Sequence, residues 1–298
     1  MNPLVEITPE LLADWPLPSI EGGGDKERRG RVLVLAGSTQ VVGAAVLTAV
    51  AALRAGAGKL QIGAPRSLAP ALALAVPEAR VIPATQTDSG ELAPEAAREL
   101  AEPLSRCKAA VVGPGMLDEA VAGELALRLA QAGGPAMVVD AAAMAGLASD
   151  PTRARAQGGQ LVLTPHFGEM ATLSDCSKAD VEADPLAKAR ALASRLNAVI
   201  ALKSADTLVV TPEGEAWRHS GGAIGLGTSG SGDVLAGVIT GLLARGASPA
   251  QATLWGVYVH GRAGERLAGR IGRLGFLARE ILDEIAPVLD GLERSARA

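Results

Sequence analysis

The stretch Gly225-Leu226-Gly227-Thr228-Ser229-Gly230-Ser231-Gly232-Asp233-Val234-Leu235-Ala236-Gly237 joins a glycine-rich loop directly to an apolar helical pattern. Its glycines permit positive φ and leave backbone N–H groups uncovered, so an anion can approach closely. Apolar residues then recur at helical spacing, which predicts a helix that begins at or just after Gly232. A helix N-terminus adds free N–H donors and the positive end of the macrodipole, so this stretch predicts an anion site.

Asp233 is the one acidic residue of this stretch, and it has two interpretations. An aspartate at the start of a helix is often a cap. A carboxylate inside an anion-binding loop can instead take a proton from a substrate or hold a metal ion. The loop alone does not decide between these roles.

The composition is that of a globular protein with an aliphatic core: of 298 residues, 48% are apolar and 2% aromatic. The formal charge of −4 gives no electrostatic footprint for nucleic acid or an anionic membrane. Cys107 and Cys176 lie far apart with no ligand cluster nearby, which predicts neither a disulfide nor a zinc site and fits the cytoplasm. The N-terminus has no signal-peptide pattern, and the longest apolar run, 41–53, is too short to span a membrane.

Strand and helix patterns alternate along the chain, which predicts βαβ units and a mostly parallel sheet covered by helices on both faces. Residues 1–30 are interpreted as a lead-in, with an exposed loop at 21–26. Strands are expected at 31–37, 59–63, 79–83, 109–112, 136–139, 160–163 and 198–202, with a hairpin at 207–211 and 215–218. Helices are expected at 43–55, 91–104 (facing solvent), 118–131, 178–196, 249–267 and 277–289. No boundary divides this pattern, so a single domain over 1–298 is expected.

Chemistry-bearing residues follow the predicted strands. They are Gly37-Ser38, Gly113-Pro114-Gly115, Asp140, Thr164-Pro165-His166 and Lys203. Because ligands of such sheets bind beyond the carboxyl ends of the strands, we expect these residues to share one rim.

Taken together, these motifs resemble the ribokinase-like superfamily, with its three-layer αβα fold. Within it, the combined pattern is similar to the bacterial NAD(P)H-hydrate dehydratases. The matching segments are Ala36-Gly37-Ser38, Gly43-Ala44, 112–115, 139–141, 163–170, Leu202-Lys203, 225–237 and, at the start of the chain, 7–12 with Leu17-Pro18. The resemblance covers nearly the whole chain, but only the dehydratase domain, since the epimerase domain of some relatives would need a couple of hundred further residues.

The resemblance implies a lyase that repairs the (6S)-hydrates of NADH and NADPH, splitting ADP to AMP and phosphate, with Mg²⁺ bridging the phosphates. Asp233 would be the general base that activates the hydroxyl for attack on the β-phosphate, and the amides of Gly230, Ser231, Gly232 and Asp233 would steady the transferred group. The relatives also imply a cytoplasmic homotetramer and a separate epimerase in the same pathway. They do not assign the metal ligands.

The implied hydrate-binding positions are Ala44, Gly115, His166 and Asp233, and the implied AMP-binding positions are Lys203, Ser204, Ala205, Asp206, Thr207 and Gly232. Each also has an ordinary structural interpretation. Ala44 can start a helix, Gly113 and Gly115 can be turn glycines, and His166 can cap a helix. Lys203 can be solvated, and Glu169 can be a first-turn carboxylate. His219 and His260 lack a strand-end position and are expected to be structural or exposed.

The chain departs from its relatives at one position. Many relatives carry Asp-Ala-Asp after the fifth strand, whereas this chain has Asp140-Ala141-Ala142. The second carboxylate is therefore absent or supplied elsewhere. Two other functions stay open: a ribokinase-like kinase of a small alcohol such as a vitamin precursor, and a catalytically silent nucleotide-binding protein. These residues do not decide whether the nucleotide used is ADP or ATP, or whether the preferred hydrate is NADHX or NADPHX.

Overall fold

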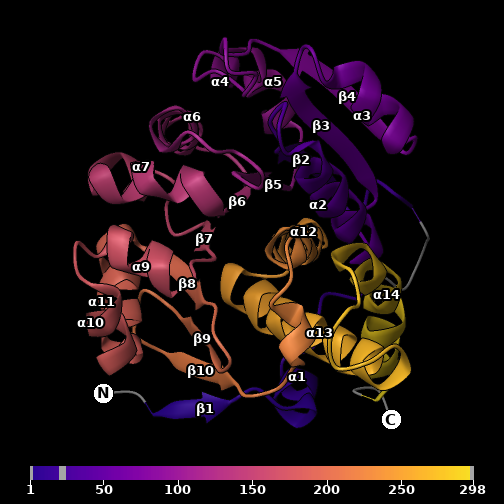
Figure 1. Ribbon diagram of the computed structural model, residues 1–298, viewed down its shortest axis with the longest axis vertical. Helices are drawn as coiled ribbons and strands as arrows, with labels where there is room; N and C mark the ends of the chain where they lie inside the picture. Colours follow the sequence, from indigo (N-terminus) through magenta and orange to yellow (C-terminus); the bar gives the residue numbers. More distant parts are fainter. Residues whose placement is uncertain (1–2, 20–24, 296–298) are drawn as a thin grey trace.

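The computed structural model describes residues 3–19 and 25–295, and their strands form one ten-stranded sheet in the order β1-β10-β9-β8-β7-β6-β5-β2-β3-β4 (Figure 1). Seven neighbouring strands, from β8 to β4, are parallel, while β9 runs antiparallel to both β8 and β10. The strands are β1 Leu4–Glu6, β2 Arg31–Leu35, β3 Lys59–Pro65, β4 Ala79–Ala84, β5 Ala109–Val112, β6 Ala136–Val139, β7 Leu161–Leu163, β8 Ala198–Leu202, β9 Thr207–Val210 and β10 Ala216–His219.

Helices cover both faces of this sheet and create two separate cores, which gives the three αβα layers. One face carries α1 Pro9–Asp14, α2 Val42–Arg54, α3 Ala69–Ala75, α12 Ser231–Ala244, α13 Pro249–Arg270 and α14 Ala278–Ser295. The other carries α4 Ala96–Glu99, α5 Ala101–Ser105, α6 Glu119–Gln131, α7 Met144–Ser149, α8 Pro151–Arg155, α9 Phe167–Leu173, α10 Lys178–Ala183 and α11 Pro185–Leu196. Two 3₁₀ turns, η1 Ala141–Ala143 and η2 Ile224–Leu226, lie at the ends of loops. The predicted α/β class with a mostly parallel sheet is confirmed.

The buried central strands are continuous apolar runs, as expected for a sheet covered on both faces. Residues of β2 and β5 are fully buried from Val32 to Leu35 and at Val111 and Val112. Alternate residues of one strand enter opposite cores: Val34 packs on the α12 side and Leu35 on the α6 side. The core is therefore built largely from Leu, Val, Ile and Ala on both faces, as the low aromatic content predicted, with Trp255 and Phe276 as its largest fully buried aromatic side chains.

The helix predicted over 91–104 is wrong in extent and in exposure. Leu92 instead bridges Gln86, and two short helices, α4 and α5, follow. Pro103 has no N–H to donate to the carbonyl of Glu99, which weakens the helix around Leu100, where α4 ends and α5 begins. Leu92 and Leu100 are completely buried, so the segment does not face solvent as the alternating charges suggested.

The helix predicted over 178–196 is also two helices, α10 and α11. Pro185 cannot donate an N–H, and the Asp184 carboxylate caps the new helix by accepting from the backbone of Ala187 at 3.0 Å. The lead-in, for which no strand or helix was assigned from the sequence, contains β1 and α1. Of its predicted loop 21–26, Asp25 and Lys26 are exposed and the rest lies outside the described residues. In that described part, no helix is long and apolar enough to cross a membrane.

Candidate active site

The glycine-rich loop delivers α12 to the rim of the sheet. Gly230 has φ +89 and caps the helix, which begins at Ser231, one residue before the position predicted from the sequence. A side chain is not tolerated at Gly230, because a Cβ there would come within 2.6 Å of Leu47. Ser231, Gly232 and Asp233 form the first turn of α12, where the Ser231 amide donates to the Thr228 carbonyl at 3.2 Å. The first N–H groups of a helix have no partner within the helix itself. The predicted helix start after the glycine-rich loop is therefore confirmed.

Asp233 occupies the third position of α12 rather than the cap. Within residues 3–19 and 25–295, no hydrogen bond is formed to the Asp233 carboxylate, so this side chain does not cap the helix. Its backbone carbonyl accepts from the Thr48 hydroxyl on α2 at 3.2 Å, which fixes the turn. Burial, and next the charge of Asp140, raise the pKa of Asp233 to about 6, although Lys203 acts to lower it. A carboxylate titrating there can take a proton near neutral pH.

Lys203 directly follows β8 and contacts two carboxylates at the rim, one after β6 and one in α9. Its Nζ lies 3.0 Å from Asp140 Oδ1 and 4.0 Å from Glu169 Oε2. Asp140 is buried, and the Thr164 hydroxyl donates to the same Oδ1 at 2.6 Å. Burial opposes the charge of Lys203, but the carboxylates of Asp140 and Glu169 outweigh that effect and raise the pKa of Lys203, so the ammonium stays charged.

The same ammonium lies next to the anion loop. A Cβ built at Gly232 would be 3.5 Å from Lys203 Nζ, so a phosphate over the first turn of α12 would also be within reach of this cation. The residues predicted for AMP binding continue from Lys203 into an exposed turn. In it, Ser204 Oγ donates to the Asp206 carbonyl at 2.6 Å and Thr207 Oγ1 donates to the Ser204 carbonyl at 3.3 Å. The turn, including Ala205, is open to solvent at this edge.

His166 does cap a helix, as its ordinary interpretation predicted. Its Nδ1 accepts from the Glu169 backbone at 3.1 Å, and Glu169 Oε2 accepts from the His166 backbone at 2.7 Å, a complete capping box on α9. His166 Nε2 lies 3.7 Å from Glu169 Oε2, and 59% of the His166 side chain is exposed. A cap and a ligand-binding ring are therefore compatible at this position.

Ala44 and Gly115 meet on the far side of the rim. Gly115 has φ +71, and a Cβ on it would lie 2.5 Å from the Ala44 Cβ. The loop holding Gly115 contacts the turn that follows β2, since the Gly37 amide donates to the Pro114 carbonyl at 2.8 Å. The glycine at 115 is thus required by both conformation and space.

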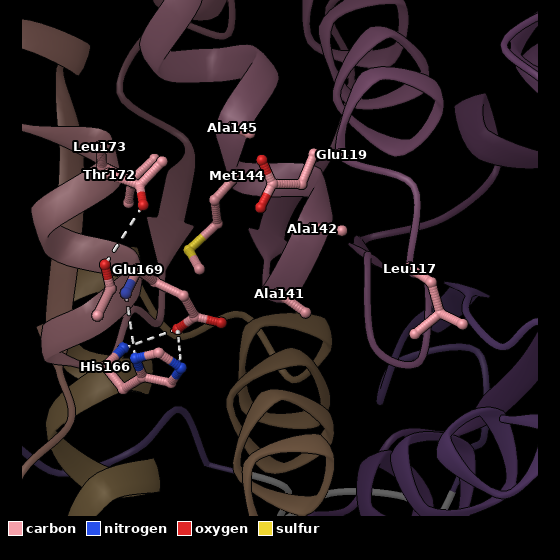
Figure 2. Close-up of a pocket in the computed structure, with 11 residues that line it drawn as sticks. Leu117, Glu119, Ala141, Ala142, Met144, Ala145, His166, Glu169, Thr172 and Leu173 are labelled. Atoms are coloured by element: carbon pink, nitrogen blue, oxygen red, sulfur yellow. Dashed lines mark hydrogen bonds and ion pairs between the residues drawn. The ribbon is translucent and has the colours of Figure 1, made fainter. Parts of the chain in front are cut away.

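A cavity of about 320 Å³ opens beside His166 (Figure 2). Figure 2 shows the side chains of His166 and Glu169 facing one another across dashed contacts, with Met144 and Glu119 across the pocket. Ala142, the position at which the resemblance implied a second acid, is among the lining residues. Glu119 and Glu169 are the two carboxylates of this lining, so the pocket is acidic without an acid at position 142.

The contacts of two supporting residues, Thr164 and His260, were not predicted from the sequence. Thr164 was noted only for its strand-end position, and its bond to Asp140 depends on neighbouring strands. His260, on α13, lies at the start of α12, where its Nε2 is 3.1 Å from the Ser231 carbonyl and 3.0 Å from Ser231 Oγ. Burial lowers the pKa of His260 to about 4, so its ring is neutral at physiological pH. His219 is buried beside Tyr258, a structural position as expected.

The mostly parallel sheet between two helical layers, with a glycine-rich loop, a lysine and an aspartate at one rim, defines a ribokinase-like fold. A family model described as NAD(P)H-hydrate dehydratase matches residues 32–287. The chain therefore belongs to the NAD(P)H-hydrate dehydratase family.

Individual relatives agree with this assignment. The chain is 47% identical over 288 residues to the ADP-dependent (S)-NAD(P)H-hydrate dehydratase of Xanthomonas campestris, covering 97% of each chain. It is 34% identical to the bifunctional NAD(P)H-hydrate repair enzyme Nnr of Escherichia coli, covering 94% of this chain and 51% of that enzyme. The crystal structure of the ADP/ATP-dependent NAD(P)H-hydrate dehydratase from Bacillus subtilis, co-crystallized with ATP/Mg²⁺, superposes with a TM-score of 0.82 at 26% identity, covering 97% of this chain and 99% of that one.

Proposed function

We propose that the protein repairs the hydrates of NADH and NADPH, converting the (6S)-hydrate back to the dinucleotide while ADP is split to AMP and phosphate. The family and the full-length relative from Xanthomonas campestris support this activity. The observation that supports this function most strongly is the position of the Asp233 carboxylate, which does not cap the helix and lies beside both the glycine-rich loop and Lys203.

In this proposal, the hydrate's hydroxyl is turned into a better leaving group. Asp233 takes the hydroxyl proton while the oxygen attacks the β-phosphorus of ADP, and the bond from that phosphorus to AMP breaks. The phosphate ester then leaves as phosphate, with loss of a proton from the neighbouring ring carbon, which restores the dihydronicotinamide. The N–H groups of Gly230, Ser231, Gly232 and Asp233 steady the phosphoryl group in transit.

The remaining residues would position the two substrates. Ala44, Gly115 and His166 would contact the hydrate. The AMP part would lie along Lys203, Ser204, Ala205, Asp206 and Thr207 and against Gly232. Support comes from their shared rim: the backbone of Lys203 donates to the Pro165 carbonyl at 2.7 Å, directly beside His166.

Mg²⁺ is proposed as the cofactor, and the donors present fit it. The carboxylates of Asp140 and Glu169 already converge on a cation, the Lys203 ammonium. Oxygen donors suit Mg²⁺, which proteins usually hold through one or two carboxylates and the substrate's phosphates. Within the described part of the chain, no group of three or more His, Cys, Asp or Glu residues could enclose the metal. The ion would therefore arrive with the nucleotide, where it would neutralise phosphate charge.

The assembly and location are proposed from the family resemblance: one domain, a homotetramer in the cytoplasm, and a separate epimerase supplying the (6S) form. Both cysteines, Cys107 and Cys176, are unpaired, which is consistent with a reducing compartment.

The test is incubation of the purified protein with NADHX, ADP and Mg²⁺, followed at 340 nm. Restored absorbance with matching AMP and phosphate is expected. Absence of NADH together with ATP-dependent turnover of a hydroxymethyl substrate would instead identify a small-alcohol kinase. Nucleotide binding with neither reaction would identify a silent binding protein, for which the missing acid at Ala142 is the main support.

A further inference from the structure

A second cavity, of about 670 Å³, opens at the amino-terminal edge of β2, β3 and β4, at the end of the sheet opposite the candidate active site. Six of its twelve lining residues are lysine or arginine and one is acidic. They are Lys26, Arg29, Arg31, Leu53, Ala57, Gly58, Lys59, Leu60, Gln61, Glu78, Arg80 and Arg106. Such a concentration of cations is unexpected in a chain with a net charge of −4.

Neighbouring carboxylates compensate only part of this charge. Glu27 pairs with both Lys59 and Arg31, and Glu102 pairs with Arg106. Within residues 3–19 and 25–295, Lys26, Arg29 and Arg80 make no ion pair. Positive charge therefore remains in excess around the concave volume, where it attracts anions.

Two buried polar groups of the same cavity also have no partner. Gln61 lies within β3 and is 4% exposed, yet its Oε1 has no hydrogen bond. The Nε of Arg29 is buried and likewise unpartnered. Buried polar groups are almost always satisfied, so each of these two calls for a group from outside the chain. Rotation of the Gln61 amide presents either its oxygen or its NH₂ to such a group.

The cavity is separated from the catalytic rim by the length of a helix. Ala44 is near the start of α2 and Leu53 near its end, and the 13 residues of α2 span about 20 Å. A molecule bound between Leu53 and Arg80 therefore does not occupy the site around Asp233.

We propose that this cavity binds a small polyphosphorylated molecule of the nucleoside di- or triphosphate type, at a site distinct from the catalytic one. Its volume is within the range of small-ligand pockets. Planar guanidinium groups match phosphate oxygens in pairs, which suits Arg29 and Arg80. The side chains of Leu53, Ala57 and Leu60 add apolar surface for the organic part of the ligand. A concave basic site of this size favours a small ligand over a nucleic acid, which needs an extended basic stripe. The inference goes beyond the proposed dehydratase function and does not depend on it.

The test uses inorganic tripolyphosphate as the probe, titrated calorimetrically into the full protein without Mg²⁺. The catalytic loop can also bind this anion, so two variants separate the sites. Arg29→Gln with Arg80→Gln removes cavity charge, and Lys203→Met weakens the catalytic site. Arg98→Gln, an exposed arginine on α4 outside the cavity, is the matched control.

We expect a salt-sensitive site in the wild type that is kept in Lys203→Met and in Arg98→Gln, and is weakened at least tenfold in the double variant. Gln61→Met, which keeps the volume and removes the amide, should weaken the same site. Thermal unfolding without ligand checks that each variant is folded. Equal binding by the wild type and the folded double variant would overturn the proposal, as would loss of all binding in Lys203→Met.

Discussion

The pH dependence of turnover tests the proposed role of Asp233 most specifically. Burial and the charge of Asp140 raise the pKa of Asp233 to about 6, and only the ionised form can act as a base. With a pKa of 6, the ionised fraction falls from nearly all at pH 7.5 to about one quarter at pH 5.5, a roughly fourfold loss in kcat/KM. An aspartate at the ordinary value of 3.8 would stay ionised over this whole range.

Two substitutions should move the acidic limb of this pH profile, the range in which turnover falls as Asp233 is protonated, in opposite directions. Asp140→Asn removes a like charge facing Asp233, so the limb moves below pH 6. Lys203→Met removes the facing cation, so the limb moves above it. The assay is the initial rate of NADHX conversion with ADP at 340 nm, at limiting NADHX, in steps of half a pH unit from 5.5 to 8. A flat wild-type profile, or a limb that neither variant moves, would refute Asp233 as the titrating base.

Three further predictions concern stability and substrate binding. Gly237→Ala should destabilise the fold by about 1–3 kcal/mol, because the new Cβ would lie 2.3 Å from the Thr48 carbonyl oxygen on α2. Gly291→Ala, in open space on α14, should stabilise the fold slightly. Thermal unfolding that ranks the two variants the other way would contradict the close packing of α12 on α2. His166→Asn should keep the helix cap and raise the KM for NADHX, whereas His166→Ala should raise the KM and also lower the unfolding free energy by about 1 kcal/mol. An unchanged KM in both variants would show that His166 is not part of the binding site. Burial lowers the pKa of His260 from 6.5 to about 4, so folding is favoured by the neutral ring above pH 6.5 and loses about 2 kcal/mol of stability as the pH falls to 5. Denaturant titrations should show a smaller loss of unfolding free energy in His260→Asn. An identical loss in that variant would contradict a buried neutral ring.

The sheet and its rim were predictable because both follow from local patterns. Continuous apolar runs identify strands buried on both faces, and parallel strands place Asp140 and Lys203 at one edge without any knowledge of their contact. The hairpin over β9 and β10 was equally readable, from two strand patterns around Pro212-Glu213-Gly214.

Errors arose where tertiary contacts override local pattern. Glu91 was assigned to an exposed helix because charges alternate around it. Its carboxylate is instead buried and accepts from the backbone of Leu117 at 3.1 Å, a contact across 26 residues. Prolines within the predicted helices, Pro103 and Pro185, were available signals for the breaks and were given too little weight.

The supporting shell of the site was the least predictable part. The Thr48 hydroxyl reaches the Asp233 carbonyl across 185 residues, and the His260 ring reaches Ser231 from the next helix. Neither partner stands in a motif, and each is fixed only when α2, α12 and α13 pack together. Asp233 also appeared to be a possible cap, and only the position of Gly230 as the actual cap resolved that ambiguity.

Comparison of Asp233→Asn with the wild type in one experiment tests most directly whether Asp233 is the general base. The substitution keeps the shape of the side chain and removes the base. AMP and ADP binding by calorimetry should be retained, while production of NADH, AMP and phosphate from NADHX and ADP, equimolar in the wild type, should fall by about 10²–10⁴-fold. A folded Asp233→Asn variant that binds nucleotide and turns over NADHX at the wild-type rate would contradict the account.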